Sequence, residues 1–169
     1  CLSLALGRKK SGEIFATSIH YVPHTGWVGE ILRIDPRTGR QTVVAQGEHL
    51  GFLLGITVQG DDIYVTGLVG HDQNYGVGQV GHVDAKTGIQ TVLTFGENLV
   101  RPVGITMDSE GQLVVADPYT MNLASPDLFD GAIIRINPAT RQQSVVVPGH
   151  GSWVNPCGVA VVTAAIRGH

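Results

Sequence analysis

Short apolar runs, each closed by a turn signal, recur along the whole chain. In the stretch 101–147, the run Gly104–Met107 is followed by a polar cluster at 108–111 and by a second apolar run at 113–117. After a long polar loop come two more runs, at 132–136 and 144–147. β-Branched residues are typical of strands, and polar clusters ending in Gly are typical of tight reversals. This stretch therefore predicts four consecutive strands, and no segment has a helical period long enough to compete.

The same order of strands and turns occurs three times. Gly55 and Gly104 begin equivalent strands 49 residues apart, Asp35 and Asp84 begin equivalent turns at the same spacing, and Gly158 follows Gly104 by 54 residues. A period of roughly 40 to 50 residues with four strands is typical of a β-propeller blade. The sequence predicts an all-β propeller unit of four-stranded antiparallel blades over 1–169. Its three repeats lie at about 1–50, 51–100 and 101–153, with one extra strand within 154–165.

Three blades do not close a ring, because propellers have typically four to eight. A half ring would leave the apolar flanks of its terminal blades exposed, which calls for a partner. Two interpretations remain open: a homodimer that completes a six-bladed ring, or a piece of a longer chain. Residues 2–6 and 158–162 both have the pattern of an innermost strand, one too many for such a dimer. Either one displaces the other across chains, or residues 1–10 run elsewhere.

Composition narrows the classes of partner. The formal net charge is −3, and Arg8-Lys9-Lys10 is the only basic run, which argues against nucleic acid as a ligand. No apolar segment approaches the roughly 20 residues of a membrane span. Cys1 and Cys157 do not make a disulfide framework and are interpreted as two thiols. The compartment stays open.

Strand alternation places two kinds of connection at opposite ends of each blade. At one end the turns are short, as at 59–62, 85–88 and 108–111, whereas the loops after the second strand are long and varied, at 20–27, 70–76 and 117–130. Long loops on a rigid scaffold commonly carry binding sites. We predict a surface for a small molecule, glycan or protein, built from His20, Tyr21, His24, Trp27, His71, Asp72, Asn74, Tyr75, Asp117, Tyr119 and Asn122. The alternative is ordinary polar loops whose Tyr and Trp pack on the ring.

Loops that precede each innermost strand would surround the mouth of the channel. Their polar residues are Glu48, His49, Glu97, Asn98, His150 and Asn155. Imidazole titrates near neutral pH and carboxylates bind cations or accept protons, so this set predicts a candidate divalent-cation or acid–base site. No HExxH or CxxC spacing supports it, and polar residues facing solvent remain the alternative.

The turns Asp35-Pro36-Arg37-Thr38-Gly39 and Asp84-Ala85-Lys86-Thr87-Gly88, with the strand start Pro102-Val103-Gly104-Ile105, resemble six-bladed propellers of the NHL, streptogramin lyase and gluconolactonase-like type. The gluconolactonase-like resemblance implies a central divalent cation held by Glu, Asn and Asp, for which Asn155, Asn98 and Glu48 stand in suitable places. The streptogramin-lyase-like resemblance implies a His base supported by a Glu, for which His150 and Glu97 are candidates. The full ligand set has no match in this chain.

Two functional hypotheses follow. The first is a non-catalytic binding or scaffold module that uses the long-loop face. The alternative is a metal-assisted hydrolase or lyase at the channel mouth, which requires carboxylate, Asn or His groups converging within one metal shell or hydrogen-bond reach. If the chain is half of a larger propeller, its function belongs to the whole protein.

Overall fold

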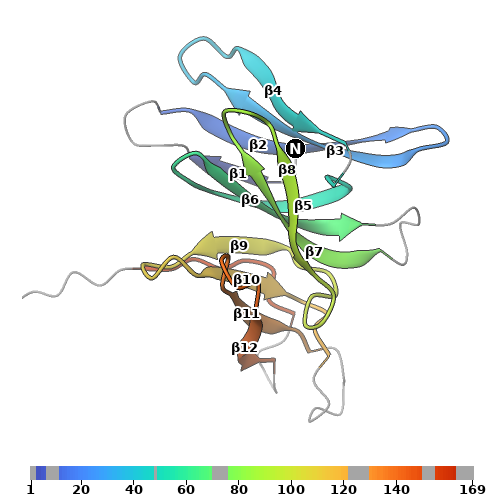
Figure 1. The fold of residues 1–169 in the computed structure, drawn as a ribbon, viewed down its shortest axis with the longest axis vertical. Coiled ribbons are helices and arrows are strands. Elements are labelled where there is room, and N and C mark those ends of the chain that lie inside the picture. Colours follow the sequence, from blue (N-terminus) through green and yellow to red (C-terminus); the bar gives the residue numbers. More distant parts are fainter. Residues whose placement is uncertain are drawn as a thin grey trace, which may run out of the picture.

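The computed structural model describes residues 3–6, 12–47, 49–69, 76–121, 130–149 and 155–162. In this part of the chain, strands form three four-stranded antiparallel sheets and no helix occurs (Figure 1). Within each sheet the strands pair in sequence order, as predicted. None of the described segments is a helix with the length and apolar character needed to cross a membrane.

We call the three sheets blades 1 to 3. Blade 1 contains β1 (Ser3–Leu6), β2 (Ile14–Val22), β3 (Gly26–Ile34) and β4 (Gln41–Gln46). Blade 2 contains β5 (Phe52–Gln59), β6 (Asp62–Val69), β7 (Val77–Asp84) and β8 (Gln90–Phe95). Blade 3 contains β9 (Gly104–Met107), β10 (Leu113–Asp117), β11 (Ala132–Ile136) and β12 (Gln143–Pro148).

The blades stack face to face in chain order, from top to bottom of Figure 1. β5 contacts β1 and β2 on one side and β9 on the other, so the first strands of the three blades line one common edge. The connections β2–β3, β6–β7 and β10–β11, with those that lead from one blade to the next, lie at one end of the blades, which we call the loop end. The connections β1–β2, β3–β4 and their equivalents lie at the opposite end, the turn end.

Two apolar cores lie between the blades. One contains Phe15 and Ile31 of blade 1 with Ile63 of blade 2, and the other contains Tyr64 of blade 2 with Leu113 of blade 3. Because side chains alternate between the faces of a strand, Ile63 and Tyr64 serve different cores. Blade 2 is therefore covered on both faces.

In blades 2 and 3, a glutamine at the start of the fourth strand joins the blade to the one before it. Gln90 donates through Nε2 to the backbone carbonyl of Gln46 at 3.1 Å and accepts through Oε1 from the backbone N–H of His49 at 3.3 Å. Gln143 donates through Nε2 to Thr94 Oγ1 at 2.9 Å and accepts through Oε1 from the backbone N–H of Asn98 at 3.1 Å. Equivalent glutamines in successive repeats therefore make equivalent hydrogen bonds between neighbouring blades.

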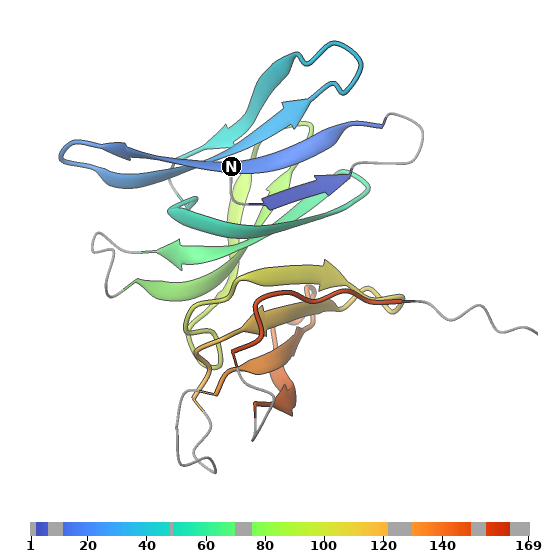
Figure 2. The ribbon, with the colours of Figure 1, turned by 180° about the vertical axis from the view of Figure 1, so that it is seen from behind.

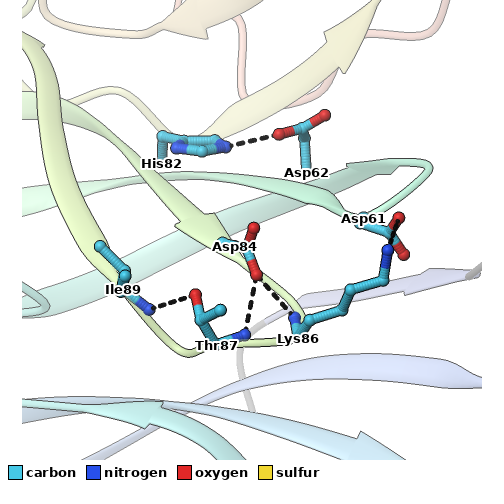
Figure 3. A network of polar contacts seen from close by, with 7 residues as sticks. All are labelled: Asp61, Asp62, His82, Asp84, Lys86, Thr87 and Ile89. Carbon is cyan, nitrogen blue, oxygen red and sulfur yellow. Dashed lines mark hydrogen bonds and ion pairs between the residues drawn. The ribbon is translucent and has the colours of Figure 1, made fainter.

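The β3–β4 turn and its two equivalents share one hydrogen-bond pattern. A side-chain oxygen of the first residue accepts from the backbone N–H two residues later: Arg37 to Asp35 at 2.8 Å, Lys86 to Asp84 at 2.8 Å, and Ala139 to Asn137 at 2.9 Å. Figure 3 shows the turn of blade 2, where Asp84 also accepts from the N–H of Thr87. Such short-range bonds close a turn without help from the rest of the fold.

Each of these turns ends on a residue with left-handed backbone. The φ angle is 70° at Gly39 and 74° at Gly88, and it is 66° at Arg141 in blade 3. A side chain disfavours this conformation, so Arg141 stands where the repeat prefers glycine.

Residues 155–162, the described part of the predicted extra strand, run beside β9 but form no strand pairing in this chain (Figure 2). A Cβ on Gly104 would overlap the carbonyl oxygen of Cys157, and a Cβ on Gly55 would overlap that of Val103. Cys157 therefore packs on blade 3 in the same way as Val103 packs on blade 2. The segment therefore lies where a further blade would begin, and none of the described residues pairs with it there as a second strand.

Candidate functional site

β2 and β3 form a long hairpin that projects from the loop end (Figure 1). Tyr21 pairs with Trp27 and Val22 with Gly26, so only residues 23–25 lie outside the strands, and the turn is closed by a bond from Thr25 N–H to Val22 O of 3.1 Å. The expectation of a long loop over 20–27 is wrong. Aromatic and β-branched residues on both sides favour strand pairing up to Pro23, which has no N–H to donate.

Three aromatic rings pack edge to face along this hairpin and onto blade 2. The ring centroids of Tyr21 and Trp27 are 5.8 Å apart, and those of Trp27 and Phe52 are 5.5 Å apart. Tyr21 is 56% exposed, whereas Trp27 and Phe52 are half-buried. Trp27 Nε1 is buried and has no hydrogen-bond partner among the described residues. Since edge-to-face packing restrains the rings, the hairpin presents Tyr21 as an anchored, exposed aromatic group.

The two histidines that were predicted together with Tyr21 and Trp27 lie elsewhere on the same hairpin. His20 is exposed on β2, where it pairs with Val28. His24 is exposed at the turn and has a φ of 68°.

A second exposed aromatic side chain lies at the loop end of blade 3. Tyr119 is 44% exposed, and the guanidinium carbon of Arg101 lies 5.7 Å from its ring centroid. A guanidinium over an aromatic face is attracted by the ring quadrupole. This contact joins the connection before β9 to the connection after β10.

Asp117 is fully buried beneath these two connections. Its Oδ2 accepts from the backbone N–H groups of Val100 at 2.7 Å and Arg101 at 2.9 Å, and its Oδ1 accepts from that of Tyr119 at 2.8 Å. Burial raises the pKa of the Asp117 carboxyl, and the backbone donors offset part of that rise. Asp117 was predicted as a ligand-binding residue. Both of its oxygens accept hydrogen bonds from backbone N–H groups, so its side chain holds the connection before β9 and the connection after β10 together.

Several predicted site residues lie outside the described residues: Glu48, His71, Asp72, Asn74, Tyr75, Asn122 and His150.

The described residues of the predicted channel-mouth site, His49, Glu97, Asn98 and Asn155, have different surroundings. The backbone of Asn98 is engaged between blades, since its carbonyl accepts from Thr120 Oγ1 at 2.8 Å. Glu97 lines an open polar groove with Arg135 and Arg141 of blade 3. His49 and Asn155 are exposed. Within the described ranges, no three His, Cys, Asp or Glu side chains are grouped as metal ligands would be.

The two ends of the blades differ in their exposed apolar side chains. The loop end carries several large ones, namely Tyr21, Val77, Phe95, Val100, Tyr119 and Met121. In the described part of the turn end, Ile89 is 65% exposed, and Val162, at the end of the segment beside β9, is 86% exposed. Val77, Phe95, Val100 and Met121 were not predicted as site residues, because an apolar residue near a strand end gives no sequence signal of its exposure.

Comparison with known proteins supports the fold. No family model matches the chain, and no curated protein matches it by sequence. Among solved structures, similar chains come from an oligogalacturonate lyase in complex with manganese (TM-score 0.55, 14% identity) and from the tricorn protease (TM-score 0.53, 17% identity). A chain of a nidogen–laminin complex has a TM-score of 0.53 and 16% identity.

The matches cover most of this chain but differ in their share of the other. They cover 85% of this chain and 40% of the lyase, 86% of this chain and 13% of the protease, and 95% of this chain and 68% of the chain from the nidogen–laminin complex. At these identities the similarity establishes the propeller-like, all-β fold alone.

Proposed function

We propose that the protein is a non-catalytic propeller module that binds a protein partner at the loop end. The observation that carries this proposal is the anchored, exposed Tyr21 on its projecting hairpin, on the end that also carries the exposed apolar side chains of Val77, Phe95, Val100 and Met121. Aromatic residues are enriched at protein interfaces, where a rigid side chain loses little conformational entropy on binding. The exposed Tyr119 extends this surface to blade 3.

We further propose that two copies complete a six-bladed ring and present two such surfaces. The NHL-like and lyase-like repeat pattern supports six blades, and the exposure of Leu4 on the first strand of blade 1, 63%, supports self-association. A metal-assisted hydrolase or lyase is the alternative, but no grouping of side chains among the described residues favours it.

A matched pair of variants tests the binding proposal. Tyr21→Ser removes an exposed apolar group at the loop end, and Ile89→Ser removes one of similar exposure at the turn end. We expect a protein captured by the wild type to bind Ile89→Ser with unchanged affinity and Tyr21→Ser at least tenfold more weakly, measured by surface plasmon resonance with the purified partner.

Equal loss in both variants, or none in either, would overturn this use of the loop end. Binding that appears only on a glycan array would replace the protein partner with a saccharide. Tight, stoichiometric uptake of manganese, measured by calorimetry and lost in Glu97→Ala, would favour the enzyme alternative.

A further inference from the structure

The outer face of blade 1 carries side chains at positions that other blades bury. Leu4, Ile56 and Ile105 occupy the same place on the first strands of blades 1, 2 and 3, as their pairing with the second strands shows. Ile56 is 5% exposed and Ile105 is 8% exposed, whereas Leu4 is 63% exposed. The face that packs on the preceding blade in blades 2 and 3 therefore has no blade to pack on in blade 1 among the described residues.

The second strands of the blades show the same difference in burial. Ile63 and Leu113 are fully buried against the preceding blade, and their equivalent in blade 1, Ile14, is half-buried. The residue type is kept while the burial is lost. At about 25 cal/mol per Å² of apolar surface, covering such a face is a substantial driving force.

The glutamine contact between blades is also incomplete at this face. Gln41 begins β4 as Gln90 begins β8 and Gln143 begins β12. Gln90 and Gln143 reach the preceding blade, while Gln41 is exposed and makes no such bond within the described residues. Blade 1 thus carries both the apolar and the polar parts of a contact with a preceding blade.

The outer face of blade 3 carries the other half of that contact. Pro156 approaches Gly131 as Pro102 approaches Gly78: in both pairs a Cβ on the glycine would lie 2.7 Å from the proline Cδ. The N–H of Asn155 donates to the carbonyl of Asp130 at 2.8 Å, which anchors the segment on blade 3. Residues 155–162 are thus held where the first strand of a following blade belongs, with their strand edge unpaired in this chain.

We propose that two copies of this chain exchange these segments. Residues 155–162 of one copy form the innermost strand of blade 1 in the second copy, in place of β1. By analogy with the pairing of β9 and β10, Gly158 lies opposite Thr17 of the other copy and Val159 lies opposite Ala16. Val159 takes the place of Leu4, and blade 1 of the second copy covers the outer face of blade 3 of the first. The inference rests on the proposed self-association and names the strand that carries it.

In the closed ring, β1 and residues 155–162 of the other copy would occupy the same innermost position of blade 1, and the exchange leaves only one of them there. β1 has four residues, so releasing it loses a short ladder that the incoming segment re-forms. The gain is the burial of both outer faces, because the same exchange in the opposite direction closes the ring by two-fold symmetry. Strand addition to an exposed sheet edge is an established way to join chains.

A disulfide trap tests the register of the exchanged strand. In this register Val159 lies opposite Ala16 of the other copy, and directly opposed residues of antiparallel strands have Cα atoms about 4.5 to 5.5 Å apart, within disulfide range. In a background with Cys1→Ser and Cys157→Ser, we expect Val159→Cys combined with Ala16→Cys to give a covalent dimer on mild oxidation. The dimer should disappear when either of these cysteines is restored to the native residue, and Thr17→Cys in place of Ala16→Cys, one residue out of register, should give at least tenfold less.

Two full-length point variants distinguish the exchanged strand from β1. Val159→Asp should give the mass of one chain by light scattering, and Leu4→Asp should keep the mass of two, with circular dichroism confirming that both are folded. The opposite result would make β1 the interface strand and overturn the exchange while leaving the dimer in place. A wild type with the mass of one chain at all concentrations would instead overturn self-association itself.

Discussion

Asp84 at the turn end and Asp117 at the loop end both hold backbone N–H groups, yet the pKa values of their carboxyls move in opposite directions. At Asp84 the backbone N–H of Thr87, followed by that of Lys86, holds the pKa below its usual range. At Asp117 burial raises the pKa although three backbone groups donate to the carboxylate. The turn end is organised by contacts a few residues apart in exposed turns, whereas the loop end is held from within by a buried carboxyl group.

The largest expected change in stability comes from removing the carboxyl group of Asp117 at the loop end. Asp117→Ala should lower the free energy of unfolding by about 3 kcal/mol, because three part-buried backbone N–H groups lose their acceptor at a cost of about 1 kcal/mol each. Asp84→Ala should cost clearly less, since the freed N–H groups meet water. Urea unfolding of both variants measures the difference. Equal losses would mean that the loop end does not depend on its buried carboxylate.

A substitution at the turn end should raise stability by relieving the unfavourable left-handed backbone at Arg141. Arg141→Gly should raise the free energy of unfolding by about 1 kcal/mol, because glycine adopts left-handed backbone without the steric cost of a side chain. Gly39 supplies the control, since its φ is similar and a Cβ there meets no atom within 4 Å. Gly39→Ala should therefore destabilise by about the same amount. A loss of stability in Arg141→Gly would show that the arginine side chain contributes more than the strain costs.

The smallest effects concern pH, and their signs differ between the two ends. For Asp84 the folded pKa is lowered, so its contribution to stability is present above the unfolded pKa of about 3.9 and is lost as pH falls through the folded value. For Asp117 the folded pKa is raised, so its contribution is present below about pH 3.9 and is lost as pH rises through the folded value.

The measurement is the free energy of unfolding from pH 2 to pH 6 for the wild type and for each Asp→Asn variant. On acidification, the wild type should lose stability relative to Asp84→Asn and gain stability relative to Asp117→Asn. If acidification changed the stability of the wild type in the same direction relative to both variants, the pKa values of Asp84 and Asp117 would not be shifted in opposite directions.

The turn end could be predicted from sequence because its signals are local. Asp35 and Asp84, with Gly39 and Gly88 four residues later, predict their turns from side-chain hydrogen bonding and left-handed backbone alone. The hairpin at Tyr21 and Trp27 was predicted as a loop because two histidines, a proline and a glycine interrupt its apolar pattern. Cross-strand ring packing holds it as a hairpin, and that packing includes Phe52, a residue of another blade. The role of Asp117 likewise depends on Val100 and Arg101, in a connection that sequence reasoning could not place.

The glutamine at the start of each fourth strand has a consequence for how such chains can be lengthened. Gln90 and Gln143 each bring, within their own repeat, the polar bonds that fasten that repeat to its predecessor. A duplicated repeat of 49 residues would carry its own fastening, and the site that receives it is built largely from backbone groups. Gene duplication could therefore add a blade at either seam without a matched change elsewhere, and a protein engineer could graft one in the same way.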